Sequence, residues 1–521
     1  MQEVSTGRVI VLGAGLAALY AALALAPRPV LLISPDPLGQ GASSAWAQGG
    51  VAAAMARPDS PEAHAADTLR AGAGIVDAEV AQSVTREARE HILSLTSLGA
   101  PFDRDAAGAD LLSREAAPGF ARVVRVRGDG AGAEIMQALV ARVRETPSVQ
   151  VLEGWLATGL RPVAGRVAGV EVMPARGGAT VHLRGTACLL AGGGSGGLYA
   201  LTTNPARIRG QAAGLAARAG AVMADMEFVQ FHPTAMDIGL DPAPLATEAL
   251  RGEGAVLVNR LGVRFMEGVH PDLELAPRDV VARAVYAQSS AGLRPMLDTR
   301  AALGSRIRED FPIVTAACDR AGIDPVTQAI PVAAAAHYHM GGVATDGAGR
   351  TSLAGLWACG EVASTGLHGA NRLASNGLLE ALVYARRCAA DIAATVGEIR
   401  EAAQVAMPPS AAAGEGLPDP HLVARLRTAM TRGVGVIRDA EGLSAALREI
   451  AAVEAAGPAC AQLADMTATA TLIAAAALAR KESRGAHFRA DATEGDPTAR
   501  RSRMTLDDAL ALRADHTEEP A

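Results

Sequence analysis

The hydrophobic pattern of the chain begins with a short apolar run that ends in glycines. Residues 8–12 (RVIVL) predict a buried strand, residues 17–26 predict a helix, and residues 29–34 (PVLLIS) predict a second strand. The turn between the first strand and the helix has the spacing G-x-G-x-x-A. Such a turn in a βαβ unit is typical of dinucleotide binding, because its glycines let the backbone approach a pyrophosphate. The acid expected after the second strand is missing, so the group that holds the ribose stays open.

A second apolar run also ends in glycines. Residues 187–191 (ACLLA) predict a buried strand, the turn 192–197 is glycine-rich, and residues 209–219 predict a helix. Between these two units, residues 64–98 predict two helices. Three short runs, 149–154, 166–173 and 180–183, predict strands of a small separate sheet. The pattern as a whole is that of an α/β protein.

The stretch 358–387 joins the end of an apolar strand to a long helix that starts near Asn376. A Gly-Glu turn and a polar loop with His368, Asn371 and Arg372 lie between them. A helix N-terminus presents free N–H groups and a positive dipole end to an electron-rich ligand. A guanidinium grips a carboxylate through two parallel hydrogen bonds. The stretch therefore predicts a cofactor held beside an acidic substrate.

Changes in composition and in the strand pattern divide the chain into three predicted domains. Residues 226–340 contain more proline and irregular strands, which predicts an inserted α+β capping domain. The residues before and after it, 1–225 and 341–405, form one interrupted Rossmann-like domain. A linker rich in Pro, Gly and Ala precedes a helical bundle with a charged, poorly ordered tail, over 406–521.

Composition and charge exclude several classes of function. The 521 residues are 50% hydrophobic, carry a net charge of −7 and show no basic block, which argues against nucleic acid. Five scattered cysteines, no signal peptide and no long apolar run favour a reduced cytoplasmic protein without a membrane span. No HExxH motif or carboxylate cluster indicates a metal site, and no G-x-S-x-G elbow indicates acyl transfer.

Polar residues gather in the inserted segment and in the stretch after it. A lone His or Arg is more often structural than catalytic, but here six such side chains accumulate in a chain poor in His. They are His232, Thr247, Arg251, Arg278, His337 and Arg372. Two guanidinium groups with His and Thr donors suit the two carboxylates of a dicarboxylic acid.

Motifs along the whole chain resemble the succinate dehydrogenase/fumarate reductase flavoprotein family, and within it the soluble L-aspartate oxidases. The matching segments are GAGLAA, AWAQGG, QFHPT, TEALRGEG, PRDVVARA, HYHMGG, ACGEVASTGLHGANRLASNGLLEAL and KESRGAHFR. The resemblance implies an FAD-binding domain, a cap that closes over the substrate and a C-terminal helical domain. It implies FAD contacts from Gly13, Ala14, Gly15, Leu16, Ser43, Ser44, Gln48, Gly49, Gly50, Glu361, Gly377 and Leu378.

The same resemblance implies the substrate site. Substrate contacts are implied for Gln230, Thr247, Glu248 and Ser375, and catalytic roles for Arg278, Glu115, His232, His337 and Arg372. Arg278 matches a proton donor or acceptor, whereas its chemistry favours a donor or a simple carboxylate clamp, because guanidinium normally stays protonated. Glu115 matches a glutamate that faces the substrate amino group. A respiratory member's flavin-linking His is replaced by Ser43, which implies non-covalent FAD.

Two departures from the family pattern affect these expectations. The loop after Glu115 reads AAPGFA over 116–121, and Gln211 replaces an acid expected near the FAD ribose. The implied reaction is oxidation of L-aspartate to iminoaspartate with O₂ or fumarate as acceptor, the first step of NAD synthesis, with a quinolinate synthase as the downstream user. The alternatives are a soluble fumarate reductase or succinate dehydrogenase flavoprotein, and an FAD-binding electron-transfer subunit that needs a partner chain.

Overall fold

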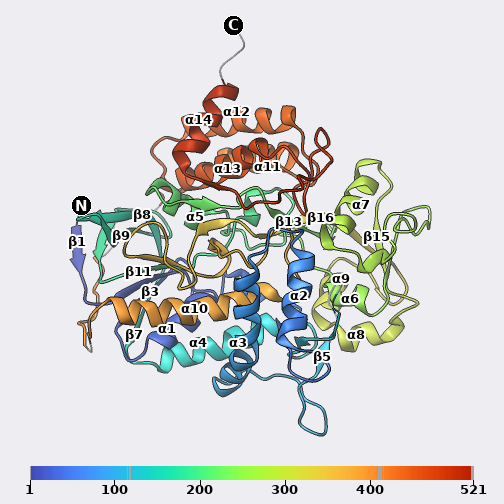
Figure 1. The fold of residues 1–521 in the computed structure, drawn as a ribbon, viewed down its shortest axis with the longest axis horizontal. Coiled ribbons are helices and arrows are strands. Elements are labelled where there is room, and N and C mark those ends of the chain that lie inside the picture. The colour runs from blue at the N-terminus through green and yellow to red at the C-terminus, as the bar shows by residue number, and fades with distance from the viewer. Residues whose placement is uncertain are drawn as a thin grey trace.

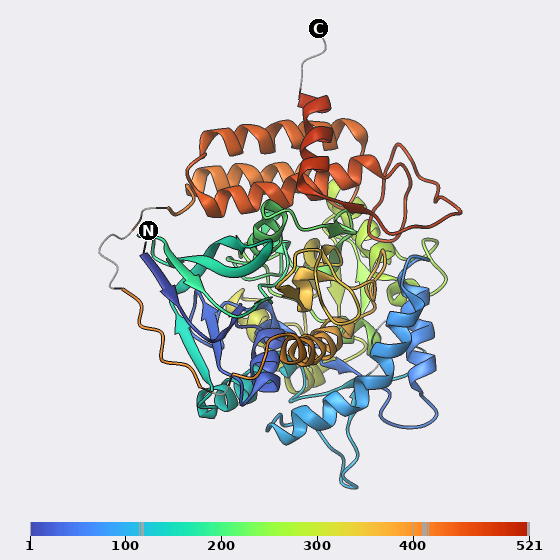
Figure 2. The same cartoon turned by 60° about the vertical axis from the view of Figure 1, so that its left-hand side comes forward.

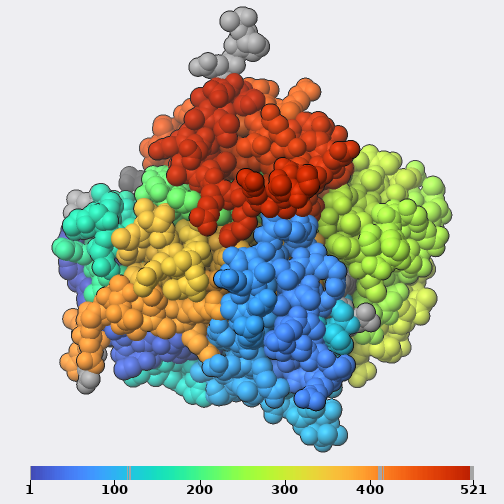
Figure 3. Space-filling view, viewed as in Figure 1, coloured from blue at the N-terminus to red at the C-terminus, as the bar shows by residue number. Residues whose placement is uncertain are grey.

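The computed structural model describes residues 2–113, 115, 119–399, 401–408, 414 and 416–517. Three bodies are visible in Figure 1: an α/β body, a segment at its right-hand side, and a stack of helices at the top. Figure 3 shows the same three bodies in contact, with the helices near residue 80 lying across the front of the α/β body. The predicted combination of an α/β body with a helical C-terminal region is confirmed.

The centre of the α/β body is a five-stranded parallel sheet. Its strands, in spatial order, are β18 (Leu356–Ala358), β11 (Cys188–Leu190), β2 (Val9–Leu12), β3 (Val30–Ser34) and β7 (Val149–Glu153). One hydrophobic core joins this sheet to the helices α1 (Leu16–Leu25), α4 (Ala131–Glu145) and α10 (Asn376–Thr395). The βαβ unit predicted at the N-terminus is confirmed, and the carboxyl ends of β2, β11 and β18 meet at one edge.

A second sheet differs from the prediction. It contains β1 (Gln2–Ser5), β10 (Val181–Arg184), β9 (Arg166–Pro174) and β8 (Trp155–Val163). The assignment of residues 149–154 to this sheet was wrong, because β7 pairs in parallel with β3 along its whole length. The physical reason is the helix α4, which precedes β7 and brings the chain back beside β3, at the edge of the central sheet.

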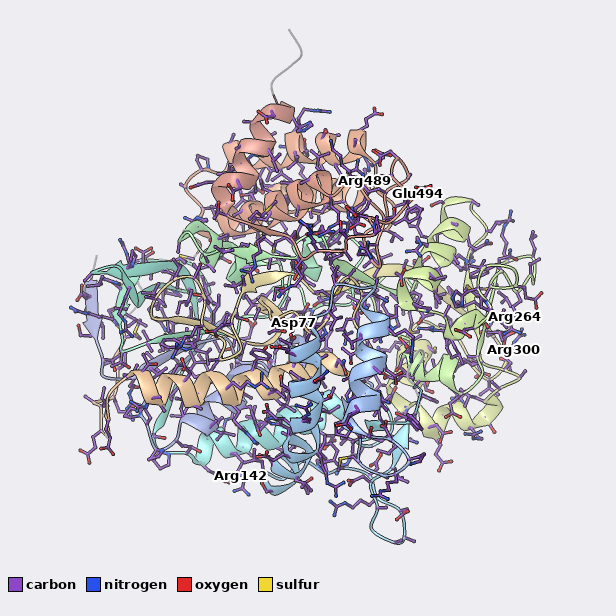
Figure 4. The ribbon with its side chains drawn as sticks, in the orientation of Figure 1. Asp77, Arg142, Arg264, Arg300, Arg489 and Glu494 are labelled. Atoms are coloured by element: carbon purple, nitrogen blue, oxygen red, sulfur yellow. The ribbon has the colours of Figure 1, made fainter. Side chains whose placement is uncertain are left out.

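Shorter elements complete the α/β body. The two helices predicted near residue 80 are α2 (Pro61–Ala71) and α3 (Ala78–Ser97), and Asp77 caps α3 by accepting the N–H groups of Glu79 and Val80 (Figure 4). Helix α5 (Gln211–Arg218) follows the second glycine turn. The small strands are β4 (Val51–Ala52), β5 (Leu112–Ser113), β6 (Val123–Val124), β12 (Met223–Ala224), β17 (Gly342–Ala344) and β19 (Ala363–Ser364).

The inserted segment has a hydrophobic core of its own. Its sheet has the order β13 (Val229–Met236), β16 (Ile330–His339), β15 (Met296–Asp298) and β14 (Val256–Val258). Its helices are α6 (Glu248–Gly252), α7 (Arg278–Ser290), α8 (Ile307–Asp310) and α9 (Pro312–Arg320). Buried apolar residues between 236 and 332 pack with one another. We call residues 226–340 the capping segment.

The C-terminal helices α11 (Pro420–Gly433), α12 (Ala440–Ala456) and α13 (Ala461–Ala479) stack above the α/β body (Figure 2). By length and composition α13 could cross a membrane, but 89% of its apolar window is buried inside the protein. The expected disorder of the tail after Ala492 was wrong over strand β20 (Arg503–Met504) and helix α14 (Leu506–Thr517). Apolar side chains three positions apart, at 506, 509 and 512, hold α14 on the bundle within an otherwise charged sequence.

Candidate functional site

A cavity of about 810 Å³ lies between the central sheet and the capping segment. Both glycine turns, the segment 40–50, strands β13 and β16 and the start of α10 contribute to its wall. Every predicted cofactor residue lines it: Gly13, Ala14, Gly15, Leu16, Ser43, Ser44, Gln48, Gly49, Gly50, Glu361, Gly377 and Leu378. The predicted substrate and catalytic residues Glu115, His232, Thr247, Glu248, Arg278, His337, Arg372 and Ser375 line it too.

Glycine is required where the backbone forms the cavity wall. Gly13 has φ +121°, and a Cβ there would lie 2.2 Å from the carbonyl oxygen of Ala191. Gly50 also has φ +121°, and its Cβ would lie 2.3 Å from the carbonyl oxygen of Val124. The Leu16 N–H donates to Ser44 Oγ at 3.1 Å, which holds the segment 40–50 against the start of α1. This end of the cavity is a backbone cradle open to a pyrophosphate.

Two acceptors in the same wall, one buried and one half-buried, suit a ligand that donates hydrogen bonds. Gln48 Oε1 is buried without a partner among the described residues. Glu361 accepts the His339 N–H at 3.0 Å, and burial raises the pKa of its carboxyl to about 7. Gly194 makes room for this carboxyl, since a Cβ there would lie 2.0 Å from Glu361 Oε1. The hydroxyl groups and ring N–H of FAD fit these acceptors.

The first turn of α10 contributes free N–H groups. The residue before the helix, Ser375, is in the left-handed region with φ 62° and does not cap the helix with its side chain. Gly377 and Leu378 follow at the cavity wall. A 20-residue helix therefore points its positive end into the cavity, where it stabilises negative charge on a ligand.

The other end of the cavity holds buried charges from the capping segment. Arg278, the first residue of α7, forms an ion pair with Glu248 and donates from Nη1 to Gln230 Oε1 at 3.0 Å. Arg251 Nη2 lies 3.3 Å from Glu248 Oε2. Burial opposes ionisation of Glu248, but the two guanidinium groups hold its pKa below the usual value. These two guanidinium groups and one carboxylate form a buried chain of ion pairs with a net charge of +1.

Arg372 differs from these residues because its charge is not neutralised. Burial, followed by repulsion from Arg278, lowers its pKa to about 10, so it remains protonated at neutral pH. Its guanidinium carbon lies 4.3 Å from the centre of the Tyr338 ring. Nε has no hydrogen-bond partner, and no carboxylate of the described chain lies within ion-pair distance. A buried cation in this state favours an anionic ligand.

Two neutral histidines stand beside the arginines. The His232 and His337 rings lie 5.0 Å apart, and burial together with Arg278 holds both pKa values well below the usual range. His232 Nδ1 accepts the Thr234 N–H at 3.2 Å, so the proton of the neutral ring is assigned to Nε2. His232 Nε2 is buried without a partner in the described chain. It is an available donor for a carboxylate oxygen.

Glu115 supplies the acid of the site. Its Oε2 accepts the Ser375 hydroxyl at 3.0 Å. Burial and the nearby Glu248 raise the pKa of Glu115 to about 7. Gly49 must lack a Cβ here, because one would lie 2.3 Å from Glu115 Oε1. In the loop around Glu115, which departs from the family pattern, Arg114 and residues 116–118 lie outside the described residues.

Gln230 is placed differently from its predicted role. It is fully buried and does not line the cavity. Besides the bond from Arg278, its Nε2 donates to Asn371 Oδ1 and to the Arg372 carbonyl oxygen, both at 2.9 Å. All its hydrogen-bonding groups are therefore used within the protein. Gln230 connects the capping segment to the Arg372 loop, and its contact with the substrate stays a prediction.

Several cavity residues were not found from the sequence. Tyr338 lies between two predicted histidines in HYHMGG, and this position was the available signal. Trp155 and Gln462 line the cavity from β8 and from α13, where no local motif marks them. Near the missing ribose acid, Asp36 pairs with Arg207 at 3.1 Å at the cavity wall, while Gln211 Oε1 accepts the Arg209 N–H. Asp36 is thus the carboxylate available to a ribose.

Comparisons with known proteins agree with this geometry. Residues 8–378 match the FAD binding domain family, and residues 423–520 match the fumarate reductase flavoprotein C-terminal family. The chain is 54% identical over 505 residues to an L-aspartate oxidase of Caulobacter vibrioides, covering 96% of each chain, and 46% identical to one of Agrobacterium fabrum, covering 96% and 94%. An E. coli quinol fumarate reductase chain superposes with a TM-score of 0.85 at 28% identity, covering 96% of this chain and 93% of that one.

Proposed function

The chain belongs to the L-aspartate oxidase family of FAD-dependent flavoproteins, and on that premise we propose how its residues oxidise L-aspartate to iminoaspartate. The reaction is the first step of NAD biosynthesis, with O₂ or fumarate as the electron acceptor. The observation that carries the proposal is the charge pattern at the substrate end. Two guanidinium groups, Arg278 and Arg372, line the same space as Glu115 and as Glu248, which is already paired with Arg278.

This pattern is complementary to aspartate as a zwitterionic dicarboxylate. The uncompensated Arg372 binds one carboxylate, and Arg278 with the Nε2–H of His232 binds the other. Glu115, when ionised, accepts a hydrogen bond from the substrate ammonium group and takes up its proton, which frees the nitrogen lone pair to form the imine as the Cα hydride leaves. Neutral His232 and His337 donate hydrogen bonds without adding charge. Succinate and fumarate fit the arginines but leave Glu115 without a cationic partner, so the carboxyl selects for an amino acid.

The remaining residues hold the reactants in place. Gly13, Gly50 and the first turn of α10 bind the cofactor, with Glu361 and Gln48 accepting hydrogen bonds from it. FAD held there would supply the acceptor for the Cα hydride and the route for the electron pair to O₂ or fumarate. The capping segment excludes water from the substrate. In the fumarate direction, the protonated Arg278 donates a proton to carbon and recovers it through Glu248 and Arg251.

Three further properties belong to the same proposal. The flavin is held without a covalent bond, since Ser43 stands where a linking His would be and donates instead to Asn204 Oδ1 at 3.1 Å. The enzyme works in the cytoplasm. A quinolinate synthase consumes its unstable imine product.

One assay separates this function from its alternatives. Purified chain is given FAD and L-aspartate, and peroxide is measured; in parallel, fumarate reduction is followed with a reduced dye. Peroxide formation that depends on L-aspartate is the expected result. Fumarate reduction without peroxide would favour the reductase, and inactivity in both assays with FAD bound would favour a subunit that needs a partner chain.

The non-covalent attachment has its own test. Acid precipitation should release the yellow flavin into the supernatant, which is measured by its absorbance. Flavin that stays in the pellet would contradict this part of the proposal while leaving the oxidase activity untouched.

A further inference from the structure

Behind Arg372 lies a buried polar cluster that the proposed mechanism does not use. It consists of Tyr338 on β16, His368 and Thr365 in the loop before α10, and Glu380 on α10. All four are at least nine-tenths buried, with exposures of 9%, 4%, 4% and 1%. We call these residues the Tyr338 cluster. Burying this many polar groups is costly unless they are mutually satisfied.

Glu380 is the centre of the cluster. Its Oε2 accepts the Tyr338 hydroxyl at 3.1 Å and lies 2.8 Å from His368 Nε2, and its Oε1 accepts the Thr365 hydroxyl. The Tyr338 hydroxyl also lies 3.2 Å from His368 Nε2. Donors from three directions thus fix the carboxylate, and the carboxylate fixes the end of the Tyr338 side chain. The hydrogen bonds of the Tyr338 hydroxyl therefore fix the orientation of the ring.

The front of the same ring faces the site. Arg372 lies over its face at 4.3 Å, the shortest cation–ring distance among the six such contacts in the described chain. Gly377 is close to both groups, since a Cβ there would lie 2.9 Å from Tyr338 Cε2 and 3.3 Å from Arg372 Nη1. The ring therefore touches both the carboxylate clamp and the helix start that faces the flavin.

We propose that Tyr338, held by Glu380 and His368, is a positioning residue that keeps Arg372 protonated and oriented for the substrate carboxylate through its ring face. The electron-rich face attracts the guanidinium without offering it a hydrogen-bond acceptor. A carboxylate at this place would neutralise Arg372 and compete with the substrate. The ring leaves the planar fork of N–H donors free for a ligand.

The inference rests on the proposed function, because it assumes that Arg372 binds substrate. Its test therefore alters the ring's electrostatics while preserving its shape. Full-length holoenzyme is prepared with Tyr338→Phe and with Phe analogues of increasing fluorination at the same position. Fluorination weakens the attraction of a ring for a cation while changing its size little.

We expect Tyr338→Phe to raise the KM for L-aspartate about two- to threefold, since only the anchoring hydroxyl is lost. Along the fluorinated series KM should then rise stepwise to about tenfold above the Phe variant, with kcat and the FAD dissociation constant within about twofold. A spectral titration of the bound flavin with succinate should show the same order of dissociation constants. A ring that only fills space would give a flat series.

Tyr384 provides a matched control. Its ring lies 5.2 Å from the Arg387 guanidinium on the same helix as Glu380, outside the cavity, so fluorination there should leave KM unchanged. A flat KM across the series at 338, or an equal rise at 384, would overturn the inference. If Arg372→Leu itself kept normal substrate binding, the proposed function would fail instead, which distinguishes the two failures.

Discussion

The two ends of the cavity are lined by different kinds of group. The cofactor end is mainly backbone: Gly13 and Gly50 make the wall, and Leu16 and Gly377 lie at the starts of two helices. The substrate end is mainly side-chain charge, with Arg278, Arg372 and Glu115 buried together. The first end binds its ligand mainly through main-chain groups, which do not titrate. The second end depends on buried charges that the substrate neutralises. Substitutions at the cofactor end should therefore weaken FAD binding, and substitutions at the substrate end should weaken L-aspartate binding.

The largest effect should come from Arg372→Leu. Removing one partner of a buried charge contact costs about 2–5 kcal/mol, so kcat/KM for L-aspartate should fall by roughly two to three orders of magnitude. The FAD dissociation constant, measured by flavin fluorescence, should stay within about twofold of wild type.

Arg387→Leu is the control for Arg372→Leu, because Arg387 is a partly buried arginine of α10 paired with Glu87 outside the cavity. Normal turnover in Arg372→Leu, or simultaneous loss of FAD, would contradict the prediction that the two ends of the cavity bind their ligands independently.

The converse change is Gly13→Ala at the cofactor end. The added Cβ meets Ala191 at 2.2 Å in a backbone conformation that L residues rarely adopt. Such strain costs about 1–3 kcal/mol, so the FAD dissociation constant should rise about tenfold to hundredfold. Titration of the apoprotein with FAD measures it.

Gly220→Ala serves as the comparison for Gly13→Ala. Gly220 also has a positive φ, of +89°, but a Cβ there meets nothing within 4 Å, and the residue is outside the cavity. Equal FAD affinities in the two variants would show that the close approach at Gly13 does not matter.

A smaller effect, with a distinct pH dependence, is expected for Glu115→Gln. Because the pKa of Glu115 is raised to about 7, the carboxyl is ionised above that pH and protonated below it. Binding of the substrate ammonium should therefore weaken as the pH falls through about 7. The variant should have a KM for L-aspartate about tenfold higher at pH 8 and should lack this pH dependence.

The dissociation constant of succinate, which has no ammonium group, is the internal control for Glu115→Gln. A variant that keeps the wild-type pH profile for L-aspartate would assign the titration to another group.

The smallest effect is expected far from both ends. Arg300 lies at the outer edge of the capping segment, exposed and paired with Asp298 (Figure 4). Exposed ion pairs contribute little to stability, so Arg300→Ala should leave KM and the FAD dissociation constant unchanged and shift the unfolding temperature by no more than about 2 °C. A larger change in KM would mean that the outer surface of the cap communicates with the substrate end.

The same contrast explains what could be predicted from the sequence. The cofactor end depends partly on a local motif, so the glycine turn that contains Gly13 was predicted from its own residues, whereas Gly50 and Glu361 were predicted through resemblance. The substrate end depends on which distant segments meet. Its lining residues were predicted through resemblance, but the role of Gln230 was not, because a hydrogen-bond network between domains leaves no pattern in the sequence.

Two errors in the fold have a related cause. The strand β7 was assigned to the wrong sheet, because a strand's own residues do not state which neighbour it pairs with. The helix α14 was overlooked, because three apolar residues among many charges bury a helix only when the bundle beneath it is present. In both cases tertiary contacts decided what local propensity left open.

Gln230 also links the two segments that carry Arg278 and Arg372. Its carboxamide accepts from the Arg278 guanidinium and donates to the main-chain carbonyl of Arg372, so it ties together the two segments that carry the carboxylate-binding groups. Because this tie limits how far the two segments can separate, we expect a diacid longer than aspartate by one methylene to bend or to displace an arginine. A hydrogen-bond network inside the protein would thus limit the chain length of the substrate.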